Sequence, residues 1–471
     1  MHVLIALNFP FTNDEGAYLY DARVLLEGRI PVGDVLTKSP SVMGLFMTGV
    51  ALTQHSLFAN RIVNVGASLV IGLIFTFGLS YVLTKRDALL SGVFWLTNGA
   101  SAIFFSLGHT QPIAALFSLV SLALYTRDSF FISGVLWALA FSARKTSLAL
   151  IPVLFVYYYL FPRKKGQLSY WLSGVAVVFL LWWSGIFVVY GWPGVKEVSG
   201  IGYAQLVWSN IAQHADVSAW GGGFFRVASV FGRFAAPVLL VTFVGVSYIF
   251  SSLVFKWPLK DPLPKIIWLP VVWLLGLGVL YSLWPTWLPE YAVDFLVPLT
   301  LLSGLTLSQL SKPWSLYIVV WVLLGFSSAW GIMSVYSSLK NPWTGMFDAS
   351  AVQEAAEYIQ ETISYSEPVL TAAVIIPYVS GHRVIEDIAH PYWYRYAFIS
   401  PQTRNVFLPS VESVNTAFAE AKWAIDEHLT GYFYRTEHVP HVDLKPPLWK
   451  QGRVFKNDTG FRSNPISIWR K

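Results

Sequence analysis

Long apolar segments recur along most of this chain, and short polar stretches separate them. A helix needs ~20 mainly apolar residues to cross ~30 Å of hydrocarbon. Segments near or below that length predict ten spanning helices, at 60–83, 88–107, 111–125, 130–142, 147–161, 168–190, 234–255, 265–283, 291–310 and 314–338. In an alternative reading, 130–161 is one helix pair broken around Arg144 and Lys145. The pattern predicts a polytopic α-helical membrane protein with about 10–11 transmembrane helices.

The N-terminal part departs from this pattern. Val3 to Phe11 is apolar but has only about half of the spanning length. We expect either a first helix that has lost its beginning or a short re-entrant segment. A polar stretch, Asn13 to Pro40, follows. Within it, Ala17 to Leu26 predicts an interfacial helix, and Ser41 to Phe58 predicts a shallow or tilted one.

The C-terminal part has the charge density and the alternation of a soluble domain. Helices are expected at 351–363 and near 411–421, and strands at 369–375, 423–425 and 466–469. The chain therefore divides into a transmembrane domain, residues 1–339, with an outer loop at 13–58, and a soluble α/β domain, residues 340–471.

Composition supports the membrane class. Of 471 residues, 55% are hydrophobic and 12% are charged, too apolar a balance for one soluble core. There is no cysteine, which excludes disulfides and thiolate metal sites. The sequence also lacks the GxxxxGK[ST], HExxH and GxSxG motifs, so it gives no sign of ATPase-type phosphate binding, of a zinc protease or of a serine hydrolase.

The net charge of +6 has a topological meaning. Basic residues occupy alternate loops between the predicted spans: Lys85 and Arg86, Arg127, Arg163 to Lys165, Lys256 with Lys260 and Lys265, and Lys312. The positive-inside rule assigns these loops to the cytoplasm. The protein is then a multi-pass cell-membrane protein whose loop 13–58 and C-terminal domain lie outside the cytoplasm, and nucleic acid is not an expected partner.

Charged residues at the outer side mark a candidate site. Asp14 and Glu15 form a carboxylate pair at the membrane surface, although they also suit a solvated interfacial helix. Arg144 and Lys145 violate the charge rule, which favours either an outward anionic ligand or a pair that snorkels at a helix end. Asp294 is ionisable inside a predicted span and is a functional candidate for that reason.

The order of several segments resembles the GT-C membrane glycosyltransferases, in the branch that contains protein O-mannosyltransferases and the lipid A aminoarabinose transferase. The segments are DEGAYLYDARVLLEGRIP at 14–31, LTKSPSVMGLF at 36–46, FANRIVN at 58–64, WALAFSARKTSLALIPV at 137–153 and LPEYAVDFLVPLTLLSG at 288–304. The motif residues would be Asp14 with Glu15, Lys38 with Pro40 after a one-residue insertion, and Arg61. The C-terminal part is similar to the soluble end domain of archaeal members.

This resemblance implies transfer of a sugar from a polyprenyl-phosphate carrier to a protein, lipid or glycan acceptor at the extracytoplasmic face. Asp14 would act as general base on the acceptor hydroxyl, and Glu15 would assist or orient it. Cations would stabilise the departing lipid phosphate, with Lys38, Arg61, Arg144 and Lys145 as candidates. For Arg61 the alternative is that it holds Asp14 or Glu15 in place.

Further residues are candidates for substrate contacts: Tyr18, His109, Gln111, Glu290, Tyr291 and Asp294. The sequence departs from the family at Gly108 to Pro112, where members commonly carry another acidic residue. No cofactor is assigned for this reason, although Asp14, Glu15 and His109 together offer ligands for a divalent metal.

Two other classes stay open. A transporter or flippase would also have many spans, but it would normally show repeated halves, and no convincing repeat is present. A non-catalytic subunit of the same fold would carry the same residues without turnover.

Overall fold

The structure is a computed structural model that describes residues 1–29, 40–79, 83–161, 164–198, 232–233, 236–254, 265–282, 291, 293–310, 314–340, 346–371, 373–385, 416, 419–426, 450–455 and 466–470. The first elements are α1 (His2–Asn8), β1 (Phe11–Thr12), α2 (Asn13–Leu26) and α4 (Pro40–Leu52). The long helices follow as α5 (Ala59–Leu73) with its π-helical continuation η1 (Ile74–Gly78), α6 (Lys85–Thr97), α7 (Gly99–Phe104), α8 (Gln111–Tyr125), α9 (Phe130–Ala143), η2 (Lys145–Ala149), α10 (Leu150–Leu160), α11 (Gln167–Val198), α14 (Ala236–Val254), η3 (Lys265–Ile267), α15 (Trp268–Ser282), α16 (Val293–Leu310) and α17 (Trp314–Lys340). The C-terminal elements are β2 (Met346–Phe347), α18 (Ala349–Thr362), β3 (Leu370–Thr371), α19 (Ile375–Ser380), β4 (Trp423–Asp426), β5 (Lys450–Phe455) and β6 (Ile466–Arg470).

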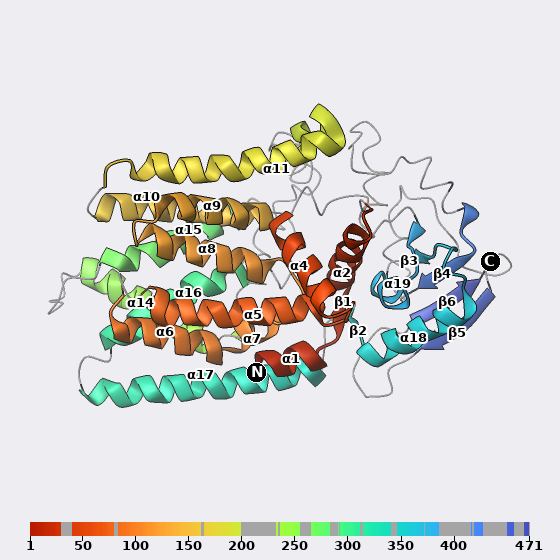
Figure 1. Ribbon diagram of the computed structural model, residues 1–471. Helices are drawn as coiled ribbons and strands as arrows, with labels where there is room; N and C mark the ends of the chain where they lie inside the picture. Colours follow the sequence, from red (N-terminus) through yellow and green to blue (C-terminus); the bar gives the residue numbers. More distant parts are fainter. Residues whose placement is uncertain are drawn as a thin grey trace.

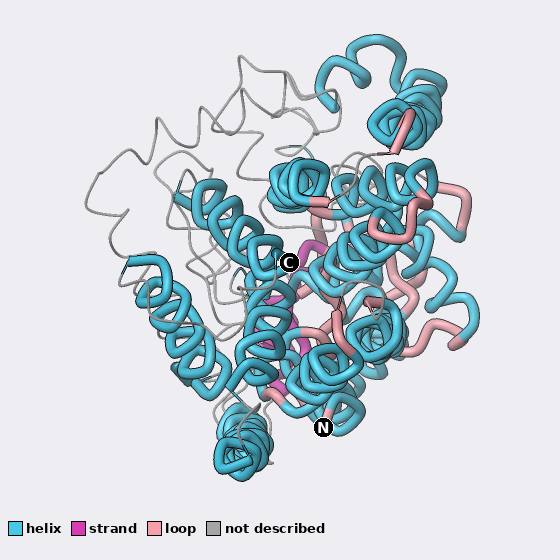
Figure 2. The backbone as a smooth tube through the Cα atoms, turned by 90° about the vertical axis from the view of Figure 1, so that its left-hand side faces the viewer, coloured by secondary structure: helices cyan, strands magenta, loops and turns pink. Residues whose placement is uncertain are grey.

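The long helices form a bundle with roughly parallel axes. Figure 1 shows α2 and α4 at one end of this bundle, between the long helices and the C-terminal sheet. In the view turned by 90°, many of the helices are seen nearly end-on (Figure 2). The molecule therefore has a helical part and a smaller α/β part, with α2 at their junction.

Helices lie where each spanning segment is predicted, with one difference, and at 130–161 the structure has the broken pair of the alternative reading. The helix expected at 88–107 is broken at Asn98, whose side chain accepts a hydrogen bond from the Ser101 amide and so caps α7. The 130–161 region is a broken pair, because α9 ends at Ala143 and a 3₁₀ turn precedes α10. Among the described residues, Ala59–Gly78 and Gln167–Lys196 are long and apolar enough to cross a membrane. That the shorter apolar helices also cross stays a prediction.

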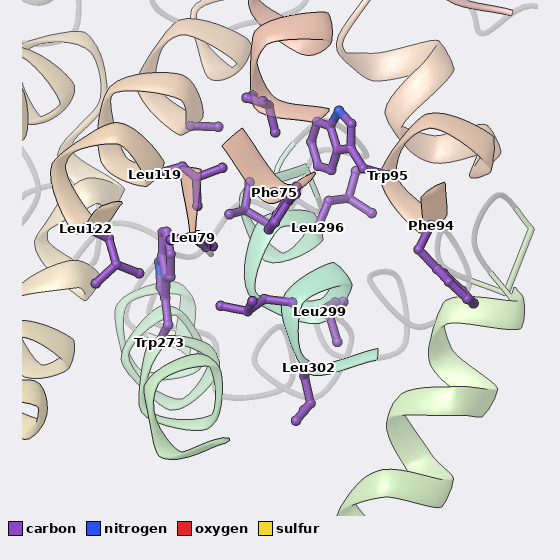
Figure 3. Packing of buried hydrophobic residues seen from close by; sticks show 14 of the residues in the cluster. Phe75, Leu79, Phe94, Trp95, Leu119, Leu122, Trp273, Leu296, Leu299 and Leu302 are labelled. Atoms are coloured by element: carbon purple, nitrogen blue, oxygen red, sulfur yellow. The ribbon is translucent and has the colours of Figure 1, made fainter. Parts of the chain in front are cut away.

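Trp95 lies at the centre of the bundle core. Its indole Nε1 donates to the Ser68 carbonyl oxygen at 3.0 Å, which satisfies the one polar atom of a buried ring. Phe105 packs edge-on against it with the centroids 4.6 Å apart. Figure 3 shows Trp95 beside Phe75 and Leu296, so this core joins helices far apart in sequence.

Two glycines allow α9 and α11 to cross at close range. A Cβ at Gly134 would collide with the Trp171 carbonyl, and a Cβ at Gly174 with the Phe131 carbonyl. Small residues bring helix backbones together in membranes, where no hydrophobic force drives helices together. The surface of α11 that faces away from this contact is apolar and open, for example at Leu180 and Phe187, as expected of a helix in lipid.

Basic loops meet at the bundle end that lies away from the C-terminal sheet. Lys164 forms an ion pair with Asp128, Lys265 donates to the Leu160 carbonyl, and Arg127 donates to the Phe77 carbonyl. Of the residues that the charge rule assigns to the cytoplasm, the described Arg127, Lys164 and Lys265 thus lie at one end. The orientation of that end in a membrane remains a prediction.

A four-stranded sheet forms the C-terminal part, in the order β3-β4-β6-β5. β3 and β4 are parallel, and the other two pairs are antiparallel. The apolar face of α18, including Ala355 and Ile359, packs into the same core as Ile425 and Ile468. The strand expected at 369–375 is wrong after Thr371, because the chain turns there into the short helix α19. We call α18, α19 and β3 to β6 the C-terminal unit; the helix expected near 411–421 lies largely outside the described residues.

Candidate functional site

The acidic pair lies inside the first turn of α2, which begins at Asn13, four residues before the predicted start at Ala17. Thr12 and Glu15 form a capping box: the Thr12 side chain accepts from the Glu15 amide, and the Glu15 carboxylate accepts from the Thr12 amide. Asp14 lies between them in the sequence and is partly exposed. A carboxylate in the first turn is stabilised by the positive end of the helix dipole.

Glu15 and Arg61 form an ion pair that is closed to solvent. The Arg61 Nε atom lies 2.7 Å from Glu15 Oε1, and Nη2 lies 2.8 Å from Oε2. The remaining guanidinium hydrogens go to the carbonyl oxygens of Ala6, Phe9 and Pro10 at 2.6–3.0 Å. All five N–H groups of Arg61 are therefore used within the protein.

The Glu15 carboxylate is equally saturated. Besides Arg61 and Thr12, the Gly108 amide donates to Oε1 at 2.6 Å. Burial acts to raise the pKa of Glu15, but the Arg61 charge and these hydrogen bonds outweigh it and lower the pKa below its ordinary value. A low-pKa carboxylate with both oxygens occupied is a poor proton acceptor, so the arrangement favours the orienting role expected for Glu15. It favours the holding role for Arg61.

The loop before α8 is attached to the same pair. His109 Nε2 lies 3.1 Å from the Thr12 hydroxyl, and the His109 carbonyl accepts from Asn64 Nδ2 at 2.8 Å. Gln111 begins α8 and is buried, and its Oε1 has no hydrogen-bond partner in the described part of the chain. His109 thus lies beside the first turn of α2 and close enough to Glu15 to act on its charge, and Gln111 follows two residues later at the start of α8.

The geometry around Asp14, Glu15 and His109 does not resemble a metal centre. Both Glu15 carboxylate oxygens accept hydrogen bonds from Arg61 and from backbone N–H groups, and His109 Nε2 is hydrogen-bonded to the Thr12 hydroxyl. The described residues contain no group of three or more His, Cys, Asp or Glu side chains placed to hold a metal ion.

A second ion pair joins Arg144, just after α9, to Asp294 in the first turn of α16. The Arg144 Nε atom lies 2.9 Å from Asp294 Oδ2, and Nη2 donates to the Tyr281 hydroxyl at 3.2 Å. Tyr281 also hydrogen-bonds Asp294, and the Tyr291 ring lies 5.1 Å from the guanidinium carbon. The structure thus brings together three residues predicted separately, Arg144, Tyr291 and Asp294, and adds Tyr281.

Lys145 points elsewhere than Arg144. Its Nζ atom lies 4.5 Å from the Phe141 ring centre and 4.8 Å from that of Trp182, positions suited to cation–π attraction. The end of α9 also meets the start of α4, where the Ser142 hydroxyl donates to Ser41 Oγ at 2.9 Å. Since α4 packs against α2, Arg144 and Asp14 belong to the same end of the bundle.

The remaining predicted residues have different outcomes. Tyr18 is on α2, half-buried, with its ring 5.9 Å from that of Phe46. Lys38 and Glu290 lie outside the described residues.

Sequence reasoning missed Thr12, Gly108, Tyr281 and Arg23. Thr12 carries a readable signal, because a threonine three residues before a glutamate is a capping-box pattern. Gly108 acts through its backbone amide, and Tyr281 and Arg23 act across long sequence separations, so no local pattern announces them.

No protein-family model and no curated protein matches this chain. Solved structures do. ArnT from Cupriavidus metallidurans bound to undecaprenyl phosphate matches with a TM-score of 0.62 and 14% identity, over 99% of this chain and 95% of that one. The Archaeoglobus fulgidus oligosaccharyltransferase in complex with Zn and sulfate matches with a TM-score of 0.60 and 11% identity, over 90% of this chain and 65% of that one.

A further structure of the archaeal enzyme, AglB in complex with an inhibitory peptide and a dolichol-phosphate, has a TM-score of 0.56 and 10% identity over 90% of this chain. Identities this low show a shared fold and leave the activity to be argued from the site. The chain has the fold of the GT-C membrane glycosyltransferases, which confirms the resemblance found in its sequence.

Proposed function

We propose that this protein is a membrane glycosyltransferase that moves a sugar from a polyprenyl-phosphate donor to an acceptor hydroxyl at the extracytoplasmic face. The observation that carries the proposal is the meeting of unlike charges at one bundle end. Asp14 is in the first turn of α2, Arg144 and Lys145 follow α9, and α4 contacts both helices. The basic loops lie at the other end, which agrees with an outward-facing site.

In the proposed reaction, the acceptor oxygen attacks the anomeric carbon while the bond from that carbon to the phosphate oxygen breaks. The acceptor proton goes to Asp14, which acts as general base. The polyprenyl phosphate leaves with one more negative charge than the phosphodiester in the donor. Cations that are fixed in a partly dry site stabilise such developing charge without reorganisation.

Arg144 is the cation best suited to the departing phosphate. Its side chain is 16% exposed, compared with 1% for Arg61, and among the described residues its Nη1 atom has no acceptor. Asp294 and Tyr281 hold the guanidinium in place. Lys145, and Lys38 by its motif position, are further candidates, and Tyr18, His109, Gln111, Glu290 and Tyr291 are proposed for contacts with sugar or acceptor.

The test is a transfer assay in proteoliposomes with radiolabelled undecaprenyl-phosphate sugars and cell-envelope extract as acceptor. The parent should form labelled acceptor and free undecaprenyl phosphate, and Asp14→Asn should slow this by about 10²- to 10⁴-fold. Asp128→Asn, at the other bundle end, is the matched control and should keep the parental rate. Movement of intact donor across the bilayer would favour a transporter. If the parent showed neither transfer nor movement of the donor, a non-catalytic subunit would be favoured.

A further inference from the structure

One stripe of α2 faces the C-terminal unit rather than the membrane helices. Gly16, Tyr20 and Arg23 follow one another at intervals of four and three residues, which places them on a single helix face. A Cβ at Gly16 would lie 2.8 Å from the Ile375 backbone nitrogen, so only glycine permits this approach of α2 to α19. Figure 1 shows α19 beside α2. The helix that carries Asp14 is therefore packed against a segment more than 350 residues away, as the Arg23 contacts also show.

Arg23 is the centre of this contact. Its Nη1 atom donates to the carbonyl oxygens of Pro377 and Tyr378, both at 2.9 Å, and Nη2 donates to that of His382 at 2.7 Å. The side chain is 4% exposed, and its guanidinium carbon lies 4.9 Å from the Tyr20 ring centre. These carbonyls belong to the end of α19 and the turn after it, which a cation stabilises.

Burial of the Arg23 charge restricts how α2 can pack against α19. The described carboxylate nearest Arg23 is Glu27, at 3.4 Å from Nε, and it is largely exposed. Burial of a guanidinium costs desolvation free energy, whereas an apolar contact between α2 and α19 would not have that cost. A planar fork bound to three fixed carbonyls instead defines one position of α2 along α19.

Two more contacts hold α2 along its length. The Val384 amide donates to the Tyr20 hydroxyl at 2.8 Å. At the N-terminal end, β1 pairs with β2, with Thr12 opposite Met346. Thr12 is the cap of α2 and lies two residues before Asp14.

We infer that Arg23 is a positioning residue for Asp14, and that the C-terminal unit is part of the catalytic apparatus because it sets the position of α2. This inference rests on the proposed function. A shift of about 1 Å in a reacting group costs up to about a hundredfold in rate. Binding of the lipid phosphate should be spared, because Arg144 and Lys145 follow α9 and are not part of α2.

The test compares Arg23→Gln and Arg23→Lys with the parent. Arg23→Gln should lower kcat about tenfold to a hundredfold. It should leave the affinity for undecaprenyl phosphate within about twofold, a split between kcat and phosphate binding that general misfolding does not produce. Arg23→Lys should recover part of kcat, because an ammonium reaches some of the carbonyls but lacks the fork. Arg453→Gln is the matched control, since Arg453 is exposed in the C-terminal unit and stacks on Tyr358 and Phe455.

A second measurement does not depend on turnover. Because the chain has no cysteine, Asn13→Cys and Leu69→Cys carry two spin labels that report the distance from α2 to the bundle. The distribution of distances between the two labels should be broader with Arg23→Gln than without it. A folded Arg23→Gln protein with parental kcat or an unchanged distribution overturns the inference. Absence of transfer by the parent overturns the proposed function instead, and the distance measurement still decides whether Arg23 positions α2.

Discussion

The two arginine–carboxylate pairs at the bundle end that carries α2 and α4 use the same residue types in opposite ways. In the Glu15–Arg61 pair both side chains are 1% exposed, and five acceptors take up the guanidinium hydrogens. In the Arg144–Asp294 pair the side chains are 16% and 8% exposed, and tyrosines supply the other contacts. A saturated pair fixes a structure, whereas a partly open pair keeps capacity for a ligand. Charge in a membrane protein thus becomes informative only when its hydrogen bonds are counted.

Removing Arg61 is expected to have the largest effect. Arg61→Met leaves the Glu15 carboxylate buried without its counter-charge, and breaking a buried pair in this way costs about 3–5 kcal/mol. The apparent unfolding temperature in detergent, followed by tryptophan fluorescence, should fall sharply. Arg144→Met, which opens the less buried pair, should lower it less.

A double variant separates lost pairing from lost packing. Glu15→Leu with Arg61→Met removes both charges, so it should be more stable than Arg61→Met alone. If Arg61→Met is as stable as the parent, the pair is not a structural clamp and the contrast between the two pairs fails.

Donor binding should respond to the other pair. Arg144→Gln should weaken undecaprenyl phosphate binding by roughly tenfold to a hundredfold, since a hydrogen bond to a charged group contributes about 1.5–3 kcal/mol. Asp294→Asn removes a competing anion and should tighten the same binding, measured by ligand fluorescence or calorimetry. Weaker binding in both variants would mean that the pair itself, rather than the Arg144 cation, forms the site.

A smaller effect is expected from the tyrosine between the two charges. Tyr281→Phe deletes the hydroxyl that contacts both Arg144 and Asp294, at about 1 kcal/mol for an ordinary hydrogen bond. Undecaprenyl phosphate binding should weaken less than in Arg144→Gln. Tyr125→Phe serves as control, because Tyr125 lies at the end of α8 near the basic loops. An effect of Tyr281→Phe equal to that of Arg144→Gln would show that orientation, and not charge, dominates.

Mild acid is expected to have the least effect. The pKa of Glu15 is lowered in the folded protein, so its contribution to stability is complete above the ordinary value of 4.5 and is lost only as pH falls through the lowered value. The stability difference between the parent and Glu15→Gln should stay constant from pH 7 to 5 and shrink below pH 4.5. A difference that already shrinks between pH 7 and 5 would mean that the carboxylate is not held in its charged form.

The sequence predicts the class and the helix positions because spanning length and loop charge are local properties. It also identifies Asp14, Glu15, Arg61, Arg144 and Asp294 as charges that need an explanation. It does not reveal which carboxylate each arginine takes, because Glu15 and Arg61, and Arg144 and Asp294, meet only through packing of helices distant in sequence. The positions where a helix is interrupted or a strand ends, such as Asn98 and Thr371, depend on capping hydrogen bonds and on tertiary contacts, which the hydrophobic periodicity does not encode.

The central claim is that Asp14 accepts the acceptor proton while a lipid phosphate departs. Its most direct test is the single-turnover yield of labelled acceptor and of free undecaprenyl phosphate, measured together in the parent and in Asp14→Asn. The account predicts equal amounts of the two products in the parent and almost none in Asp14→Asn, although that variant still binds undecaprenyl phosphate. Formation of both products by Asp14→Asn at the parental rate would contradict it.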